Sequence, residues 1–223
     1  MTWVGDGLIE TMRVRHGQIP LLERHVARLG RSLVALGGAV PPGDLAALAR
    51  GGGAEAGEGA DRIVRLAVRD GVPSVMTRDM PPHSPPVVIV ATEPHAPYPH
   101  KTTARGVFDR ALAEARAQGA DDALLVTAAG AIAEGTTWSL FWWEGDRLCT
   151  PALDLGILPG VGRARVMELV RVAEVRVTAA AFAGRSLFLV NAVRGIVPIG
   201  SFRGRDVPLD ARTAELSRRF WPD

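Results

Sequence analysis

The stretch Glu93-Pro94-His95-Ala96-Pro97-Tyr98-Pro99-His100-Lys101-Thr102-Thr103 determines how this chain is organised. Its three prolines lack the backbone N–H that a helix needs, so residues 93–100 are predicted to be extended and to separate two domains. We therefore expect a small N-terminal domain at 1–94, a linker at 95–100 and a larger domain at 101–223. A chain of 223 residues is long enough for two domains that each bury a core.

The residues before the linker predict a small α+β domain. Alternation of apolar and polar residues predicts strands, and apolar residues three or four positions apart predict helices. Strands are expected at 8–14, 18–22, 62–69, 73–78 and 87–92, with the first two forming a hairpin, and helices at 23–36 and 44–49. The glycine-rich segment 51–59 is expected to be a surface loop.

The residues after the linker predict a second α+β domain. Helices are expected at 103–118, 163–170 and 209–220, and strands at 122–127, 131–134, 138–143, 147–149, 175–178, 186–191 and 196–199. We expect both domains to be built around mixed or antiparallel strands. The predicted fold class is therefore α+β.

Lys101 is the only lysine among the 26 basic residues, and the other 25 are arginines. A genome rich in guanine and cytosine would explain the excess of arginine. Some chemistry is nevertheless closed to arginine, because a guanidinium stays protonated whereas a desolvated lysine can lose its proton and form a Schiff base. Composition makes Lys101 a candidate nucleophile, and a lone surface lysine is the alternative.

Charge and composition exclude several other classes of function. The formal net charge is only +2 and the arginines are scattered among acidic residues, so no nucleic-acid partner is expected. No apolar run approaches the ~20 residues that cross a bilayer, so no membrane association is expected. The single cysteine, Cys149, fits a reducing compartment, and we expect a cytoplasmic protein. The five histidines lack the spacing of metal ligands, so no metal site is expected.

Six short motifs occur along the chain in the order found in one enzyme family. They are GDGLIET at 5–11, ERHVARL at 23–29, HKTT at 100–103, AEGTT at 133–137, LPGVGR at 158–163 and NAVRGIVP at 191–198. Each motif alone is weak, because short degenerate patterns recur by chance. Together they make the chain, from Val4 to Phe202, resemble the class IV aminotransferases, which are fold type IV pyridoxal-phosphate enzymes. HKTT and NAVRGIVP are similar to the aminodeoxychorismate lyase branch in particular.

The resemblance implies roles for two of the candidate residues. Lys101 would carry the aldehyde of pyridoxal 5′-phosphate and then move protons on the substrate as the catalytic acid and base. Glu134 would face the pyridine nitrogen, where a carboxylate favours the protonated ring. The alternative for Glu134 is a solvated turn residue.

The resemblance also implies a site for the cofactor phosphate. Val161 and Gly162 open a predicted helix, and backbone N–H groups at a helix N-terminus bind phosphate. Arg28, Asn191 and Ala192 would complete the site, although Arg28 could equally be a solvent-facing arginine. Many relatives have a threonine where this chain has Gly162.

The activity implied by the resemblance is that of a 4-amino-4-deoxychorismate lyase, which releases pyruvate and forms 4-aminobenzoate for folate synthesis. Arg194 and Arg105 are the candidates for binding the substrate carboxylates, and either could be a surface residue. The alternative activity is a transaminase of branched-chain or D-amino acids. A further alternative is a homologue that has lost catalysis and serves as a binding protein.

Two expectations about assembly follow from the same resemblance. Members of the family are homodimers, so a symmetric dimer is expected. Relatives usually have two additional short strands ahead of Gly5, so either the small domain is shortened at its N-terminus or the recorded start codon is wrong.

Overall fold

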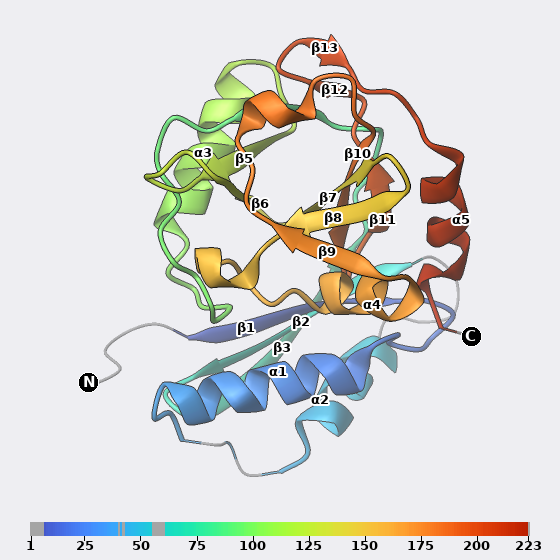
Figure 1. Cartoon of the computed structure of the whole chain (residues 1–223). Helices are drawn as coiled ribbons and strands as arrows, with labels where there is room; N and C mark the ends of the chain where they lie inside the picture. Colours follow the sequence, from blue (N-terminus) through green and yellow to red (C-terminus); the bar gives the residue numbers. More distant parts are fainter. Residues whose placement is uncertain (1–6, 40, 42, 55–60, 223) are drawn as a thin grey trace. The chain divides into compact units, whose positions relative to one another are not determined.

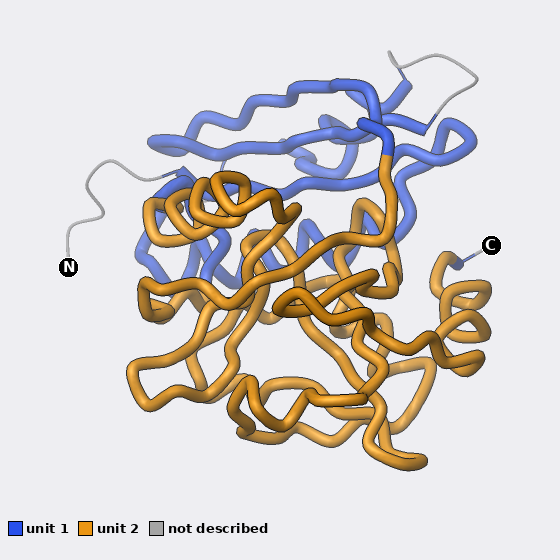
Figure 2. Tube along the Cα trace, turned by 90° about the horizontal axis from the view of Figure 1, so that it is seen from above, with its two compact units in different colours: residues 1–82, 100–104, 222 blue, residues 83–99, 105–221, 223 orange. Residues whose placement is uncertain are grey.

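The computed structural model describes residues 7–39, 41, 43–54 and 61–222, and these form two compact units (Figure 2). Unit 1 contains the described residues up to 82, residues 100–104 and Pro222, and unit 2 contains residues 83–99 and 105–221. These units differ from the domains predicted at 1–94 and 101–223. The strand at Val87–Val90 and the proline-rich segment up to Pro99 belong to unit 2, whereas Lys101 belongs to unit 1.

Unit 1 is an antiparallel sheet with two helices on one face (Figure 1). Its strands are β1 (Leu8–Val14), β2 (Arg62–Arg69) and β3 (Val72–Asp79), in that order across the sheet, and its helices are α1 (Leu22–Ala35) and α2 (Leu45–Ala54). Apolar side chains from alternate positions of β1 and β2 pack against α1 and α2 and form the core of the unit.

The predicted strand at 18–22 is wrong. After β1 the chain forms only an isolated bridge between Arg15 and Gln18, because Pro20 has no N–H to donate and Leu21 adopts a left-handed conformation with φ +63°. Helix α1 begins at the next residue.

The surface loop predicted at 51–59 is wrong up to residue 54. Helix α2 extends through Gly51–Gly53 instead. A Cβ atom at Gly52 would lie 2.3 Å from Val75 of β3, so the helix can approach the sheet this closely only at a glycine. Residues 55–60, the rest of the expected loop, lie outside the described residues.

Unit 2 contains two five-stranded sheets. The first has the order β11-β10-β7-β8-β9, with strands at Gly195–Pro198, Leu187–Asn191, Ser139–Glu144, Arg147–Pro151 and Val172–Val175. The second has the order β13-β12-β4-β5-β6, with strands at Arg205–Asp206, Ser201–Phe202, Val87–Val90, Asp122–Val126 and Ile132–Gly135. Both sheets mix parallel and antiparallel pairs, as expected for the α+β class.

Three helices of unit 2 pack beside these sheets (Figure 1). Helix α3 (Gly106–Ala117) packs on β5, and α4 (Val161–Leu169) and α5 (Ala211–Phe220) pack near β10 and β11. The core between the sheets includes the fully buried Trp142, with Phe182 packed edge-on against it. No helix among the described residues is both long and apolar enough to span a bilayer.

Several elements of unit 2 depart from the sequence prediction: β12 and β13 were not predicted, and α3 begins at Gly106 instead of residue 103. The strand predicted at 175–178 instead occupies Val172–Val175, where it pairs in parallel with β8. Alternation continues from Val172 to Thr178, so the pattern alone does not fix which part pairs. Helix α4 starts at Val161, two residues earlier than predicted, because Gly160 provides its extended N-cap residue.

Candidate active site

Lys101 is held at the free edge of β1 in unit 1. The Ile9 N–H donates a hydrogen bond to the Lys101 carbonyl at 2.9 Å, and the Thr103 N–H donates to the Gly7 carbonyl at 2.8 Å. Thr102 forms an antiparallel bridge with Leu8. Residues 101–103 therefore run along β1 as a short additional strand, which fixes the backbone that carries the lone lysine.

A buried charged cluster lies in the same unit. Glu10 projects from the centre of β1. Its Oε1 accepts a hydrogen bond from Arg28 Nε at 2.8 Å, and its Oε2 accepts one from Arg28 Nη2 at 2.5 Å and lies 2.6 Å from His25 Nδ1. All three residues are at most 5% exposed. Arg28 is thus not the solvent-facing arginine that its helix position also allowed. Glu10 and His25 were not predicted as site residues, although both lie within the quoted motifs.

The electrostatics of this cluster keep its members in defined charge states. Burial alone would raise the pKa of Glu10, but the charges and hydrogen bonds of Arg28 and His25 outweigh burial and lower that pKa to about 2. Burial lowers the pKa of His25, against the opposing effect of Glu10, and the charges of Arg28 and Lys101 lower it further. His25 Nε2 is buried and has no hydrogen-bond partner among the described residues. Because a carboxylate can only accept, Nδ1 of His25 donates to Glu10.

Glu134 lies on β6 in unit 2 and is 5% exposed, so it is not the solvated turn residue that the sequence left open. His95 Nε2 lies 3.0 Å from Glu134 Oε1, and the Leu158 N–H donates to the same oxygen at 3.2 Å. No hydrogen bond from any described residue reaches Oε2. One oxygen of Glu134 is therefore fixed by the protein, and the other is left for a further donor.

His95 was not predicted as a site residue. It lies in the proline-rich segment, its backbone N–H donates to the Val126 carbonyl at 2.6 Å, and its ring meets Phe108 edge-on at 6.0 Å. Its Nδ1 atom is buried without a partner among the described residues. Since a carboxylate can only accept, Nε2 carries the proton. The proline-rich segment thus positions the donor that orients Glu134.

A second buried carboxylate holds the turn after β6. Asp122 accepts the Thr136 N–H at 2.9 Å and the Thr136 hydroxyl at 2.8 Å. Burial raises its pKa, although the hydrogen bonds from Thr136 oppose this effect. These bonds fix the backbone just after Glu134.

The N-terminus of α4 lies against the end of β10. No side chain caps the helix at Gly160, so its first N–H groups are not used by a capping residue. A Cβ atom at Gly162 would lie 2.8 Å from the Asn191 carbonyl carbon, so any side chain there would collide with the backbone of β10. This close approach explains why glycine occupies position 162.

Asn191, the last residue of β10, lies beside this helix end, and Ala192 follows it in the chain. The Asn191 side-chain oxygen accepts the N–H groups of Val193 (3.0 Å) and Arg194 (2.7 Å), which fixes the turn after β10. Ala192 is 8% exposed. The backbone around the α4 N-terminus is therefore rigid and carries N–H donors and the positive end of a helix dipole.

The two arginines predicted to bind substrate have different surroundings. Nη2 of Arg105 donates to the Thr136 carbonyl at 2.6 Å, and its guanidinium lies 5.0 Å from the centre of the Phe108 ring. Arg105 is thus engaged in holding the turn after Glu134. Arg194 is half-buried, and its charge, after burial, contributes to a lowered pKa of His83.

Within the described residues, no group of three potential metal ligands comes together. The predicted site residues are divided between the two units. Lys101 and Arg28 belong to unit 1, and Glu134, Val161, Gly162, Asn191, Ala192, Arg194 and Arg105 belong to unit 2.

Comparison with known proteins gives the same family that the motifs resemble. The amino-transferase class IV family matches residues 7–202. The chain is similar in structure to a "putative amino-acid aminotransferase" from Mesorhizobium loti, with 31% identity, coverage of 89% of this chain and 100% of that chain, and a TM-score of 0.81. A search of curated proteins found no match.

Two further solved structures have a similar fold. A fold IV transaminase from Curtobacterium pusillum has 26% identity and a TM-score of 0.85, and the match covers 97% of this chain and 84% of that chain. A "putative 4-amino-4-deoxychorismate lyase" from Legionella pneumophila has 24% identity and a TM-score of 0.82, and covers 97% of this chain and 92% of that chain.

Proposed function

This chain belongs to the class IV aminotransferase family, whose cofactor is pyridoxal 5′-phosphate, and we propose that it is a 4-amino-4-deoxychorismate lyase. The lyase would release pyruvate from its substrate and leave 4-aminobenzoate, a precursor of folate. The observation that supports the cofactor is Glu134, whose Oε1 takes two hydrogen bonds and whose Oε2 takes none from a described residue, and the HKTT and NAVRGIVP segments favour the lyase activity. A buried carboxylate with one free oxygen suits a protonated ring nitrogen.

The chain's residues fit the chemical groups of pyridoxal phosphate. The uncapped N-terminus of α4, with Val161, Gly162, Asn191 and Ala192, suits a phosphate because backbone N–H groups and the helix dipole favour an anion. Glu134 suits the pyridine nitrogen. When bound, the cofactor withdraws electrons from the substrate carbon that loses a proton.

Lys101 is proposed to hold the cofactor covalently and then to act as the catalytic acid and base. Its backbone is fixed on β1, so the amine is carried from a rigid element. Release of the amine when substrate binds would leave it able to remove a proton from the ring carbon next to nitrogen. Loss of pyruvate then forms an aromatic ring, which makes the elimination strongly downhill.

Arg28 is proposed to contact the phosphate, with Glu10 fixing its orientation. Glu10 holds Nε and Nη2 of the guanidinium, so the side chain has little freedom to move. Arg194 is proposed as the first candidate for a substrate carboxylate and Arg105 as the second, and Arg105 also donates to the Thr136 carbonyl at 2.6 Å.

The experiment that tests the lyase uses the purified protein loaded with cofactor. Pyruvate and 4-aminobenzoate should appear from aminodeoxychorismate at equal rates, and Lys101→Ala and Lys101→Arg should both abolish release. Arginine keeps the positive charge but cannot be deprotonated, so it separates charge from nucleophilicity. Transfer of the amino group to 2-oxoglutarate without pyruvate release would contradict the lyase.

A transaminase is the second candidate, because the Mesorhizobium loti structure with 31% identity has an aminotransferase name. A transaminase would use Lys101 and Glu134 in the same way, but a proton would be returned to the cofactor and no pyruvate would be eliminated. The HKTT and NAVRGIVP segments favour the lyase. A homologue without catalysis would bind no cofactor, so borohydride reduction that attaches the cofactor to Lys101 would exclude it.

The proposed assembly is a symmetric homodimer in the cytoplasm. The resemblance to a family of homodimers and the single cysteine, Cys149, support this proposal. Light scattering of the purified protein should give twice the chain mass of 23.7 kDa, and a monomer across the micromolar range would contradict the dimer.

A further inference from the structure

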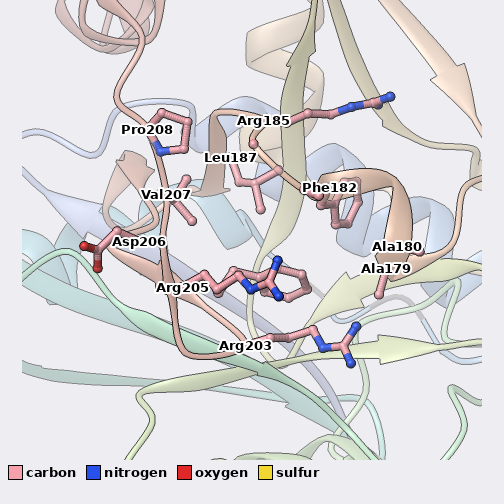
Figure 3. Close-up of a pocket in the computed structure, with 13 residues that line it drawn as sticks. Ala179, Ala180, Phe182, Arg185, Leu187, Arg203, Arg205, Asp206, Val207 and Pro208 are labelled. Carbon is pink, nitrogen blue, oxygen red and sulfur yellow. The ribbon is translucent and has the colours of Figure 1, made fainter.

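A groove opens in unit 2 between the short helical turn at Ala179–Phe182, the start of β10 and the β12–β13 hairpin (Figure 3). Its volume is about 300 Å³, which is within the range of small-molecule sites. Its floor is apolar, because Phe182, Leu187 and Phe202 are each at most 7% exposed, and the two phenylalanine rings lie 5.9 Å apart. No residue proposed to hold the cofactor lines this groove.

Two arginines at the rim have no carboxylate partner. Arg203 and Arg205 extend in the same direction across the groove, whereas Asp206 points to the opposite side (Figure 3). Neither side chain forms an ion pair or a hydrogen bond with any described residue. A third arginine in the lining, Arg185, is held by Glu144 at 2.9 Å. The rim therefore carries two arginines that pair with no carboxylate among the described residues, beside one carboxylate, Asp206, that points away from them.

The backbone that presents Arg203 is unusual for this residue type. Arg203 has φ +51° and Gly204 has φ +72°, so the hairpin turns through two left-handed residues. Asparagine or glycine would adopt the first position at lower cost. The Arg203 N–H also donates to the Val88 carbonyl at 3.0 Å, which anchors the turn to β4. A rigid turn thus holds a long cationic side chain at the groove.

We infer that this groove binds a small aromatic carboxylate. The ring would lie on the floor formed by Phe182 and Phe202, and the carboxylate would bind Arg203 and Arg205. A guanidinium presents a fork of donors that matches a carboxylate. An inorganic anion would make no use of the apolar residues that line the groove, and a neutral aromatic molecule would leave both arginines without an anionic partner. This inference does not rest on the lyase reaction.

The test uses the cofactor-loaded protein and benzoate as the probe. Benzoate should shift the amide NMR signals of residues 179–187 and 201–207. The double variant Arg203→Asn, Arg205→Gln should weaken this binding by at least about tenfold, because it removes two charge-assisted hydrogen-bond donors. Asparagine tolerates the left-handed conformation at 203, so the hairpin should be kept.

The matched control is the double variant Arg116→Gln, Arg218→Gln, which removes the same charge from exposed positions on α3 and α5 and should bind benzoate unchanged. Benzyl alcohol and inorganic phosphate should both bind at least about tenfold more weakly than benzoate. Equal binding of benzyl alcohol or of phosphate would overturn the inference. So would an equal loss in the control variant, or benzoate shifts confined to other residues.

Discussion

At the residue scale, Glu134 owes its orientation to a neighbour that the motifs did not identify. His95 and the Leu158 N–H both bind one carboxylate oxygen, and this directs the second oxygen away from the protein donors. His95 does not need to touch the cofactor to affect how tightly it is bound. We therefore describe it as a positioning residue.

Replacing His95 tests this role. His95→Phe keeps a flat ring beside Phe108 but removes the donor to Glu134, so we expect pyridoxal phosphate to bind about tenfold more weakly. His95→Gln keeps an N–H donor and should recover part of the affinity. Binding is measured from the cofactor absorbance, and the nitrogen-15 chemical shift of the bound pyridine ring should move towards the neutral form in His95→Phe. Equal affinities in the two variants would contradict the positioning role.

Glu10 is expected to make unit 1 sensitive to acid. Its pKa of about 2 lies below the usual 4.5, so the unfolded chain binds a proton more readily than the folded one. The resulting stability, about 3 kcal/mol, is fully present above pH ~4.5 and is lost as the pH falls towards 2. Urea unfolding at a series of pH values should show this loss.

The matched variants for this prediction are Glu10→Gln and Glu215→Gln. Glu10→Gln should lower the free energy of unfolding at pH 7 by about 3–5 kcal/mol, because Arg28 remains buried without its counter-charge, and should flatten the acid dependence. Glu215 lies on the exposed surface of α5, so its substitution should change neither. An unchanged acid slope in Glu10→Gln would refute the assignment.

At the element scale, the sequence patterns predicted most helices and strands. The predictions were wrong where contacts with distant parts of the chain determine the local structure. Pro20 and the left-handed Leu21 end the first hairpin before its second strand forms. Gly51–Gly53 read as a flexible loop, yet the close packing of α2 on β3 requires a residue without a side chain. In the candidate site, Lys101 and Glu134 came from recognisable motifs. His95 and Asp122 could not be predicted, because only the folded chain brings them to Glu134 and Thr136.

Two glycine substitutions compare α4, the helix of the proposed phosphate site, with α1, where a substitution should not affect cofactor binding. Gly162→Ala places a Cβ atom 2.8 Å from the Asn191 backbone, so we expect α4 to shift, cofactor affinity to fall by tenfold or more and stability to fall by about 1–3 kcal/mol. Gly30→Ala on α1 meets no atom within 4 Å and should stabilise the protein by about 0.5–1 kcal/mol without changing affinity. Thermal unfolding and cofactor titration of both variants provide the comparison. Unchanged affinity in Gly162→Ala would argue against a phosphate site at α4.

At the scale of the whole molecule, the chain passes between its two units more than once. It leaves unit 1 after residue 82, returns for residues 100–104 and then continues in unit 2. The lysine proposed to hold the cofactor is therefore on the short returning segment, whereas the proposed ligands of the ring and the phosphate, apart from Arg28, belong to unit 2. Each unit has its own apolar core.

This division predicts how the cofactor changes hydrogen exchange. If residues of both units hold one cofactor, loading should slow amide exchange in residues 7–14 and 101–103 of unit 1 and in residues 132–135 and 161–169 of unit 2, because ligand binding stabilises whatever it contacts. In Lys101→Ala the covalent bond is lost, so protection should fall most in unit 1 and persist in part around α4. The exposed end of β3 at 76–79 gives an internal reference. Protection confined to unit 2 in the wild-type protein would mean that the lysine plays no part in binding, since a covalent bond to Lys101 cannot form without restraining the strand that carries it.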